Sequence, residues 1–317
     1  MRSFEEHRAA VESRIERWCA AIPANGLHEP MAYLMRLPAK RVRPVAVLMA
    51  HELFGGAVEG ALEEALGMEL FHNFTLMHDD IMDQAPLRRG RPTVHARWNV
   101  NTAILSGDAM LVRAYMQMGC DAGVLELFNR YALEVCEGQQ LDMDFERREG
   151  VSLAEYQAMI RLKTAVLLSC SMQVGAVRAG AASSDVQRIG DFGEHLGLAF
   201  QLRDDLLDAF GDPAKVGKQV AGDLRAGKKT WLLIRGVELG RAQGNSVLAT
   251  ELNKTPADRD VARMIATLEE LGVRAEAEAE VALHDAAALT SLDAIDVPED
   301  RKRPLRELAA MLMLRTH

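Results

Sequence analysis

Apolar residues recur every three or four positions along most of the chain, which is the spacing of a buried helix face. One such face contains Leu66, Leu70, Phe74 and Met77. Glycine and proline interrupt the pattern at 23–30, 38–44, 84–92, around 150, at 180–184 and 211–227, and near 256 and 298. Because these residues break helices, we expect roughly a dozen helices and an all-α fold.

The composition agrees with one helical domain. Hydrophobic residues make up 49% of the 317 positions, enough for a sizeable core, whereas aromatic residues make up only 5%. Runs of β-branched residues are scarce, and sheets are rich in them. No change of composition divides the chain, so we expect a single domain over residues 1–317.

Charge and cysteine use narrow the range of partners. A net charge of −9 leaves no extended basic face, so we expect no nucleic-acid partner. The four cysteines lack CxxC spacing, which argues against a zinc site or a disulfide framework. The charged, amphipathic N-terminus is unlike a signal sequence, and no run of about 18 apolar residues occurs. We therefore expect a soluble, cytoplasmic protein without a transmembrane segment.

An Asp-Asp-x-x-Asp motif occurs twice, at residues 79–83 and 204–208. Each copy ends a long apolar segment and precedes a polar loop that contains glycine, proline and positive charge. In a helix, the first and last aspartates of a motif share one face, and the second lies about 100° around the axis. Like charges at this spacing repel each other, and apolar neighbours such as Met77 and Ile81 increase the cost of burying them.

These carboxylates predict a metal site. Six aspartates, with no histidine or cysteine inside either motif, favour a hard cation, and Mg²⁺ binds a few carboxylates together with substrate phosphates. Two such clusters predict several Mg²⁺ ions that hold one diphosphate and stabilise a leaving group. The alternative is a pair of solvated acidic helix ends, but the flanking residues of both copies are apolar.

Basic residues near the motifs predict phosphate binding. Arg88 and Arg89 follow the first motif, and Lys40 and Arg43 lie beside an expected helix start at Pro44. Guanidinium groups bind phosphate oxygens with paired hydrogen bonds, and the dipole of a helix N-terminus attracts anions. Taken alone, Lys40 and Arg43 are equally well explained as surface charge.

Residues 222–228 read Gly-x-x-x-x-Gly-Lys, which is close to an ATP-binding phosphate loop. Residue 229 is lysine, so the serine or threonine hydroxyl that binds Mg²⁺ in such loops is absent. No strand pattern precedes the segment either. We therefore do not expect a nucleotide site.

The segments LMHDDIMDQAPLRRGRPTVH and FQLRDDLLDAFGDPAKVGK resemble the two aspartate-rich regions of short-chain trans-polyprenyl diphosphate synthases, the farnesyl and geranylgeranyl diphosphate synthases. Order, spacing and flanking residues agree from 40 to 230. The resemblance implies a single large helical bundle of the isoprenoid synthase type around a central cavity. One departure is Pro38-Ala39, which stands where the family usually has Gly-Gly and puts the local loop geometry in question.

The resemblance also implies roles for individual residues. Asp79, Asp83 and Asp204 are expected to bind Mg²⁺ directly, and Asp80, Asp205 and Asp208 directly or through water. We expect roughly three ions, for which Mn²⁺ can substitute. Positions that match isopentenyl diphosphate-binding residues are Lys40, Arg43, His72 and Arg89. Positions that match residues for the allylic diphosphate or its developing cation are Arg88, Lys163, Thr164, Gln201, Lys218 and, in a loop that covers the active site, Lys228. The residues expected to take part in catalysis are Asp79, Asp80, Asp83, Arg88, Lys163, Asp204 and Lys218.

Some of these residues have a simpler interpretation when the resemblance is set aside. His72 and Gln201 would be hydrogen-bonded core residues, and Lys163 with Thr164 would be a solvent-facing pair. Only their match to the family motifs makes them candidate site residues.

The implied reaction is the head-to-tail, 1′-4 condensation of isopentenyl diphosphate with dimethylallyl, geranyl or farnesyl diphosphate. Apolar helix faces would enclose the growing hydrocarbon and exclude water. Phe74 and Thr75, five and four residues before Asp79, are expected to form the floor that limits the product to geranylgeranyl or farnesyl diphosphate. The apolar stretch 102–118 predicts a homodimer.

Two other functions are weighed against this one. A class I terpene cyclase shares one aspartate-rich motif but usually carries a different second metal motif and lacks paired arginines. A regulatory subunit of a heteromeric prenyl synthase would be expected to have lost one motif, and both are intact here.

Overall fold

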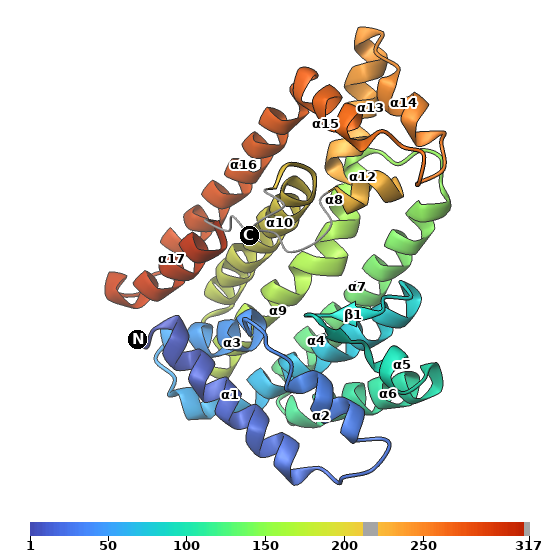
Figure 1. The fold of residues 1–317 in the computed structure, drawn as a ribbon. Coiled ribbons are helices and arrows are strands. Elements are labelled where there is room, and N and C mark those ends of the chain that lie inside the picture. The colour runs from blue at the N-terminus through green and yellow to red at the C-terminus, as the bar shows by residue number, and fades with distance from the viewer. Residues whose placement is uncertain (212–220, 314–317) are drawn as a thin grey trace. The chain divides into compact units, whose positions relative to one another are not determined.

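The computed structural model describes residues 1–211 and 221–313. These residues are helical almost throughout (Figure 1), which confirms the predicted all-α fold. The chain divides into two compact units, each described by itself below. Unit 1 comprises residues 1–129, 170–189 and 296–305, and unit 2 comprises residues 130–169, 190–295 and 306–317. The single domain over 1–317 stays a prediction.

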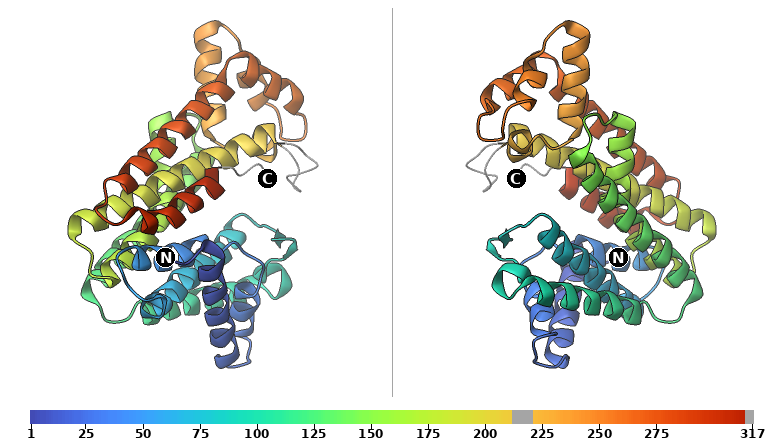
Figure 2. Two further views of the ribbon diagram at one scale, coloured as in Figure 1. Left: turned by 90° about the vertical axis from the view of Figure 1, so that its left-hand side faces the viewer. Right: turned by 90° about the vertical axis from the view of Figure 1, so that its right-hand side faces the viewer.

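The helices of unit 1 pack around α4. The elements that lie wholly within this unit are α1 (Phe4–Ala21), α2 (Glu29–Met35), α3 (Val42–Leu53), η1 (Val58–Ala61), α4 (Leu62–Met82), β1 (Leu87–Arg88), β2 (Arg91–Pro92), α5 (Val94–Arg97) and α6 (Val100–Gln117). Figure 2 shows these blue to teal elements grouped together, and α4 packs against α3 and α6. The predicted apolar face of α4 is confirmed at Leu66, Leu70 and Met77, which are fully buried.

Unit 2 has a core of its own. Its elements are α8 (Leu153–Ile160), the π-helical turn η2 (Arg161–Ala165), α12 (Gly222–Ala226), α13 (Trp231–Gln243), α14 (Val247–Leu252), α15 (Val261–Glu270) and α16 (Val273–Asp293). The core contains Tyr156 of α8, Trp231 of α13 and Met264 of α15. Helices that contribute residues to both units are α7 (Ala122–Arg147), α9 (Val166–Arg178), α10 (Ser183–Phe210) and α17 (Glu299–Met313).

One helical stretch of the described residues, Leu153–Arg178, is long and apolar enough to cross a membrane. It consists of α8, η2 and α9, and 72% of its most apolar window is buried inside the protein. A helix at the core of a globular protein has the same composition, because its side chains pack against other helices. The cytoplasmic location stays a prediction.

Candidate active site

The first aspartate motif lies at the C-terminal end of α4. Asp79 and Asp80 belong to its last turn, and Asp83 is the C-cap residue, whose amide donates to the Asp79 carbonyl at 2.9 Å. Asp83 keeps a right-handed helical backbone, so Asp79 and Asp83 share one helix face as predicted. Asp80 is only 2% exposed, whereas Asp79 is half-buried and Asp83 is exposed.

Arg88 binds the buried carboxylate of this motif. Its Nε lies 2.9 Å from both oxygens of Asp80, and its Nη2 lies 2.7 Å from Asp80 Oδ1. Burial raises the pKa of Asp80, and the hydrogen bonds and charge of Arg88 oppose that rise. The pair holds Asp80 inside the protein, while Asp79 and Asp83 remain nearer the surface of α4.

The loop after the first motif forms a short antiparallel hairpin of β1 and β2, which the sequence analysis did not predict. Leu87 pairs with Pro92 and Arg88 with Arg91, so the turn consists of Arg89 and Gly90 alone. Their φ angles of 52° and 72° are those of a type I′ turn. A residue with a side chain costs about 1–2 kcal/mol in this left-handed region, and such strain is common at functional sites.

Arg43, His72 and Arg89 form a positively charged cluster in unit 1. Arg43 Nη1 lies 3.2 Å from His72 Nε2. Burial, and then the charges of Arg43 and Arg89, hold the pKa of His72 well below its ordinary value, so its neutral ring accepts a hydrogen bond from Arg43. Burial lowers the pKa of Arg43 to about 10 and also lowers the pKa of Arg89, although Glu69 compensates for part of the charge. Crowded guanidinium groups of this kind are suited to bind an anion.

Lys40 and Arg43 lie at the start of α3. This helix begins at Val42 rather than at Pro44, so Arg43 belongs to its first turn. Lys40 is exposed and Arg43 is half-buried. The first N–H groups of a helix have no intrahelical acceptor, which adds hydrogen-bond donors beside the two cations.

The second motif, in the last turns of α10, also has a buried middle aspartate. Asp205 is 5% exposed, and its Oδ2 accepts hydrogen bonds from the Tyr156 hydroxyl at 2.5 Å and from the Trp231 amide at 3.4 Å. Gln201 Nε2 donates to Oδ1 at 3.3 Å. Burial raises the pKa of Asp205 to about 7, although Tyr156 and Gln201 act to lower it. Asp205 therefore anchors α10 to α8 and α13.

Asp208 connects α10 to α12, the short helix that follows residues 212–220. Its Oδ2 accepts from the Asp223 amide at 3.0 Å, and its carbonyl accepts from the Ala221 amide at 2.7 Å. Asp204 is half-buried and lies one turn before Asp208 on the same helix face.

A small cavity of about 40 Å³ in unit 2 brings several predicted residues together. It is lined by Asp142, Tyr156, Lys163, Thr164, Gln201, Asp205 and Lys228, among others. Lys163 Nζ lies 2.5 Å from Asp142 Oδ2, and the Thr164 hydroxyl donates to Gln201 Oε1 at 3.2 Å. Lys163 is thus held beside the second motif by an ion pair within unit 2, rather than pointing into solvent.

Lys163 and Thr164 lie in the π-helical turn η2, and single π turns inside helices are frequent at functional sites. The turn packs closely against Gly138 of α7: a Cβ at that position would lie 2.3 Å from the Lys163 amide nitrogen. Only glycine permits this approach, which also brings Asp142, one helical turn after Gly138, within reach of Lys163.

Asp142 and Tyr156 were not predicted as site residues from the sequence. A signal for Asp142 was present, because a glycine and a carboxylate four residues apart lie on one face of α7 and permit close contact with a polar partner. Tyr156 had no such signal, because its spacing is that of an ordinary core residue.

Two predicted residues of the loop after the second motif have different outcomes. Lys218 lies outside the described residues. Lys228 is exposed and lines the cavity described above. The glycine-rich segment 222–228 forms the short helix α12 followed by Gly227 with φ 72°, and no strand precedes it in the described part of the chain. It is therefore not a phosphate loop of the nucleotide-binding kind.

Phe74 and Thr75 lie on α4, one turn before the first motif. The ring of Phe74 is half-buried between those of Phe71, at 5.6 Å between centroids, and His78, at 4.9 Å. The Thr75 hydroxyl donates to the His72 carbonyl at 2.8 Å, which turns it back onto the helix. Of the two, Phe74 has the bulk to close a hydrocarbon channel.

Comparison with known proteins identifies the family. The sequence model of the polyprenyl synthetase family matches residues 24–268. This chain belongs to the polyprenyl synthetase family. It is 38% identical to geranylgeranyl diphosphate synthase of Sulfolobus acidocaldarius over 243 residues, 74% of each chain. It is 37% identical to (2E,6E)-farnesyl diphosphate synthase of Mycobacterium bovis over 279 residues, 85% of this chain and 78% of the relative.

Solved structures of the family have the same fold. A crystal structure of geranylgeranyl pyrophosphate synthase matches with a TM-score of 0.94 and 38% identity over the full length of both chains. The structure of geranylgeranyl pyrophosphate synthase from Corynebacterium glutamicum, complexed with isoprenyl diphosphate and magnesium, matches with a TM-score of 0.87 and 26% identity over 99% of this chain and 100% of that one. The predicted helical bundle of the isoprenoid synthase type is confirmed.

The contact between Gly138 and η2 leads to a test of the unit 2 cavity. We expect Gly138→Ala to lower the rate of prenyl transfer at least about tenfold, because the added methyl group forces η2 away and separates Lys163 from Asp142. The matched control is Gly123→Ala on the same helix, where the nearest atom is a side-chain methyl of Val177 at 3.3 Å. Rates and melting temperatures are measured for both variants. Equal rates would show that the π turn does not need this contact.

Proposed function

We propose that this chain joins isopentenyl diphosphate to allylic diphosphates head-to-tail and releases diphosphate, as a short-chain trans-prenyl diphosphate synthase. The main observation is in unit 1, where Arg88 binds Asp80 of the aspartate motif and the charge of Arg89 acts on Arg43 of α3. Such a surface is suited to bind an anion that also carries metal ions. The names of the relatives support the same activity.

On this proposal the cluster of Arg43, His72 and Arg89, with Lys40 beside it, binds isopentenyl diphosphate. The neutral ring of His72 matters here, because it accepts a hydrogen bond from Arg43 and orients that guanidinium without adding a charge of its own. The backbone of Arg89 supports its role in binding isopentenyl diphosphate. Its φ is positive, and residues other than glycine in this region are common at functional sites.

The carboxylates fit a hard divalent cation such as Mg²⁺, because they are oxygen donors without a histidine or cysteine among them. Asp79 and Asp83 are the residues of unit 1 that would hold such a cation, and Asp204 is the residue of unit 2 that would. Asp80, Asp205 and Asp208 accept hydrogen bonds from Arg88, Tyr156 and the Asp223 amide, and we assign them to positioning or to contacts with the metal, directly or through water. Bound Mg²⁺ would stabilise the negative charge of the departing diphosphate.

The remaining residues of the proposed site act on the allylic substrate. Lys163, Thr164, Gln201 and Lys228 line one cavity of unit 2, and we assign them to the allylic diphosphate. The allylic C–O bond breaks, the isopentenyl double bond attacks the resulting cation to form the new C–C bond, and the released diphosphate takes the proton. Apolar side chains around the hydrocarbon exclude water that would quench the cation.

The two alternative functions receive no support. The relatives reported above are named as prenyl diphosphate synthases and not as cyclases. Both aspartate motifs are intact, whereas a regulatory subunit would be expected to have lost one of them.

We expect the reaction to depend absolutely on Mg²⁺ or Mn²⁺. EDTA should abolish incorporation of labelled isopentenyl diphosphate, and added metal should restore it. Asp79→Ala and Asp204→Ala should each lower the rate by about three orders of magnitude or more, because each removes stabilisation of transition-state charge. The control is Asp144→Ala, an exposed aspartate of α7. Full turnover in EDTA, or losses below about tenfold in both variants, would exclude the metal mechanism.

We also propose a homodimer that buries one face of α6. Val112 and Met116 are 60% and 61% exposed, and Leu105 is 60% exposed, which is unusual for large apolar side chains on one helix. Light scattering should give twice the 34.9 kDa mass of one chain. Leu105→Glu with Val112→Glu should dissociate the dimer, whereas Leu283→Glu, an exposed leucine of α16, should not. A wild-type mass of a single chain at micromolar concentration would refute the proposal.

For product length we propose the twenty-carbon geranylgeranyl diphosphate, with the fifteen-carbon farnesyl diphosphate next. Phe74 is held between the rings of Phe71 and His78, so it would form a firm floor. Phe74→Ala should lengthen the product by at least one five-carbon unit, as sized by mass spectrometry after dephosphorylation. Phe54→Ala, a half-buried phenylalanine after α3, should not. An unchanged distribution in Phe74→Ala would place the limit on another residue.

A further inference from the structure

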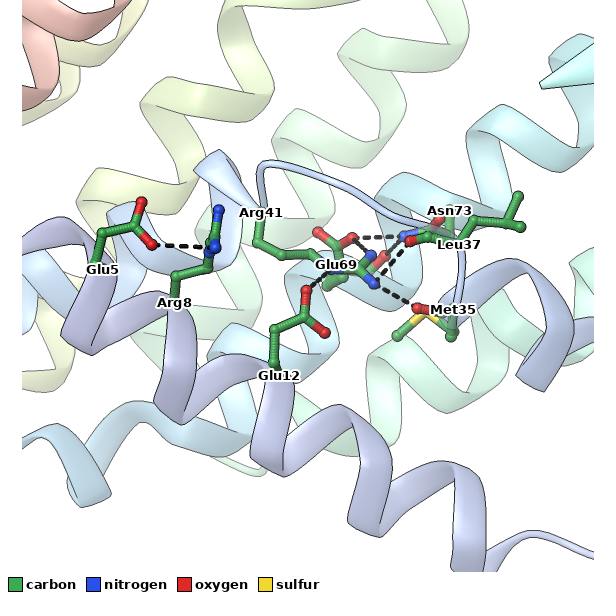
Figure 3. A network of polar contacts seen from close by, with 8 residues as sticks. All are labelled: Glu5, Arg8, Glu12, Met35, Leu37, Arg41, Glu69 and Asn73. Carbon is green, nitrogen blue, oxygen red and sulfur yellow. Dashed lines mark hydrogen bonds and ion pairs between the residues drawn. The ribbon is translucent and has the colours of Figure 1, made fainter. Parts of the chain in front are cut away.

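Arg41 lies between the two proposed isopentenyl diphosphate residues Lys40 and Arg43, yet its side chain turns away into the interior of unit 1 (Figure 3). It is only 3% exposed. Its backbone is left-handed, with φ 55° and ψ 34°, and it is the N-cap residue of α3. No glycine stands at this position or the two before it, so the side chain must hold a backbone that the sequence alone disfavours.

The guanidinium of Arg41 uses all three of its nitrogens. Nε donates to Glu12 Oε1 of α1 at 2.9 Å, and Nη1 donates to Glu69 Oε1 of α4 at 2.6 Å (Figure 3). Nη2 donates to the carbonyls of Met35 and Leu37, at 2.5 and 3.2 Å. Arg41 is the last residue of the loop between α2 and α3. Its hydrogen bonds join this loop to α1, to α4 and to the end of α2 at Met35.

The partner carboxylate of Glu69 is itself fixed in place. Glu69 is 1% exposed, and Asn73, one turn later on α4, donates to the same Glu69 Oε1 at 2.8 Å. Burial acts to lower the pKa of Arg41, but Glu69 and Glu12 raise it above its ordinary value. Arg41 and Glu69 are therefore a charged pair in the interior of unit 1, and neither can lose its partner without leaving a buried charge.

The charge of Glu69 also reaches the anion-binding cluster. Its carboxylate acts on the pKa of Arg43 and on that of Arg89, and in both cases it opposes the lowering caused by burial. Without Arg41, Glu69 would be free to attract these two guanidinium groups and to repel a diphosphate. Arg41 therefore neutralises a buried carboxylate that would compete with the substrate.

We propose that Arg41 is a positioning residue for the isopentenyl diphosphate site, which fixes the left-handed turn between Lys40 and Arg43 and cancels the charge of Glu69. It does not touch the substrate. The inference rests on the proposed function, because it assumes that Lys40, Arg43 and Arg89 bind isopentenyl diphosphate.

The test compares KM values for the two substrates. We expect Arg41→Gln to raise the KM for isopentenyl diphosphate about twentyfold and to leave the KM for geranyl diphosphate within about threefold. Arg41→Lys keeps the positive charge but loses the planar set of guanidinium N–H donors. Its KM for isopentenyl diphosphate should therefore lie between those of wild type and Arg41→Gln. Adding Glu69→Gln to Arg41→Gln should lower the KM for isopentenyl diphosphate again by at least about fivefold, because the competing carboxylate is gone.

The matched control is Arg14→Gln. Arg14 also joins α1 to α4, through two hydrogen bonds to Glu63 at 2.8 and 2.6 Å, but it does not contact the loop. Both KM values of this variant should stay within about twofold of wild type. If Arg41→Gln does not fold, Glu12→Gln tests the role of Arg41 instead. The side chain of Glu12 is 41% exposed, so its loss should not prevent folding. This variant should raise only the KM for isopentenyl diphosphate.

The outcomes separate the two proposals. An active wild type in which Arg41→Gln changes neither KM, or raises both equally, would overturn the role of Arg41 alone. A double variant no better than Arg41→Gln would overturn the charge argument. A wild type that incorporates no isopentenyl units would overturn the proposed function, and this inference with it.

Discussion

The middle aspartate of each motif is buried and bound by a donor of the protein itself, and the rest of the site depends on this constraint. Asp80 is bound by Arg88, and Asp205 by Tyr156, Gln201 and the Trp231 amide. A buried carboxylate without such partners would be prohibitively unfavourable. Each buried aspartate therefore sets the rotation of its helix, and helix geometry then decides where the first and last aspartates of the motif lie.

The cations of the proposed site, Arg43 and Arg89, also lie near a buried carboxylate, Glu69. A buried carboxylate that is paired with a guanidinium group acts less strongly on other cations nearby than an unpaired one would. Glu69 is bound by Arg41 and Asn73, and its remaining charge opposes the lowering of the pKa values of Arg43 and Arg89, the residues proposed to bind a diphosphate. The protein holds like charges close together, and the free energy of relieving that repulsion becomes available for binding.

Backbone strain marks the same residues. Arg41 and Arg89 both have positive φ without being glycine, and each lies in a loop that carries a proposed diphosphate ligand. The π turn at Lys163 is a third departure from regular structure, and it needs Gly138 to accommodate it. Such departures persist only where surrounding contacts hold them, so they indicate where precise side-chain placement has been favoured over local stability.

The sequence by itself determined the all-α fold, the helix face of Leu66 and Leu70, and the pairing of Asp79 with Asp83, because helical periodicity is a local property of the chain. The family motifs also predict site roles for Arg88 and Lys163, and these roles stay predictions. The sequence could not indicate that Asp142 binds Lys163, that Tyr156 binds Asp205, or that residues 87–92 form a hairpin. It likewise placed the start of α3 two residues late. Those features depend on contacts between segments distant in the chain, and only the tertiary structure brings their hydrogen-bond partners together.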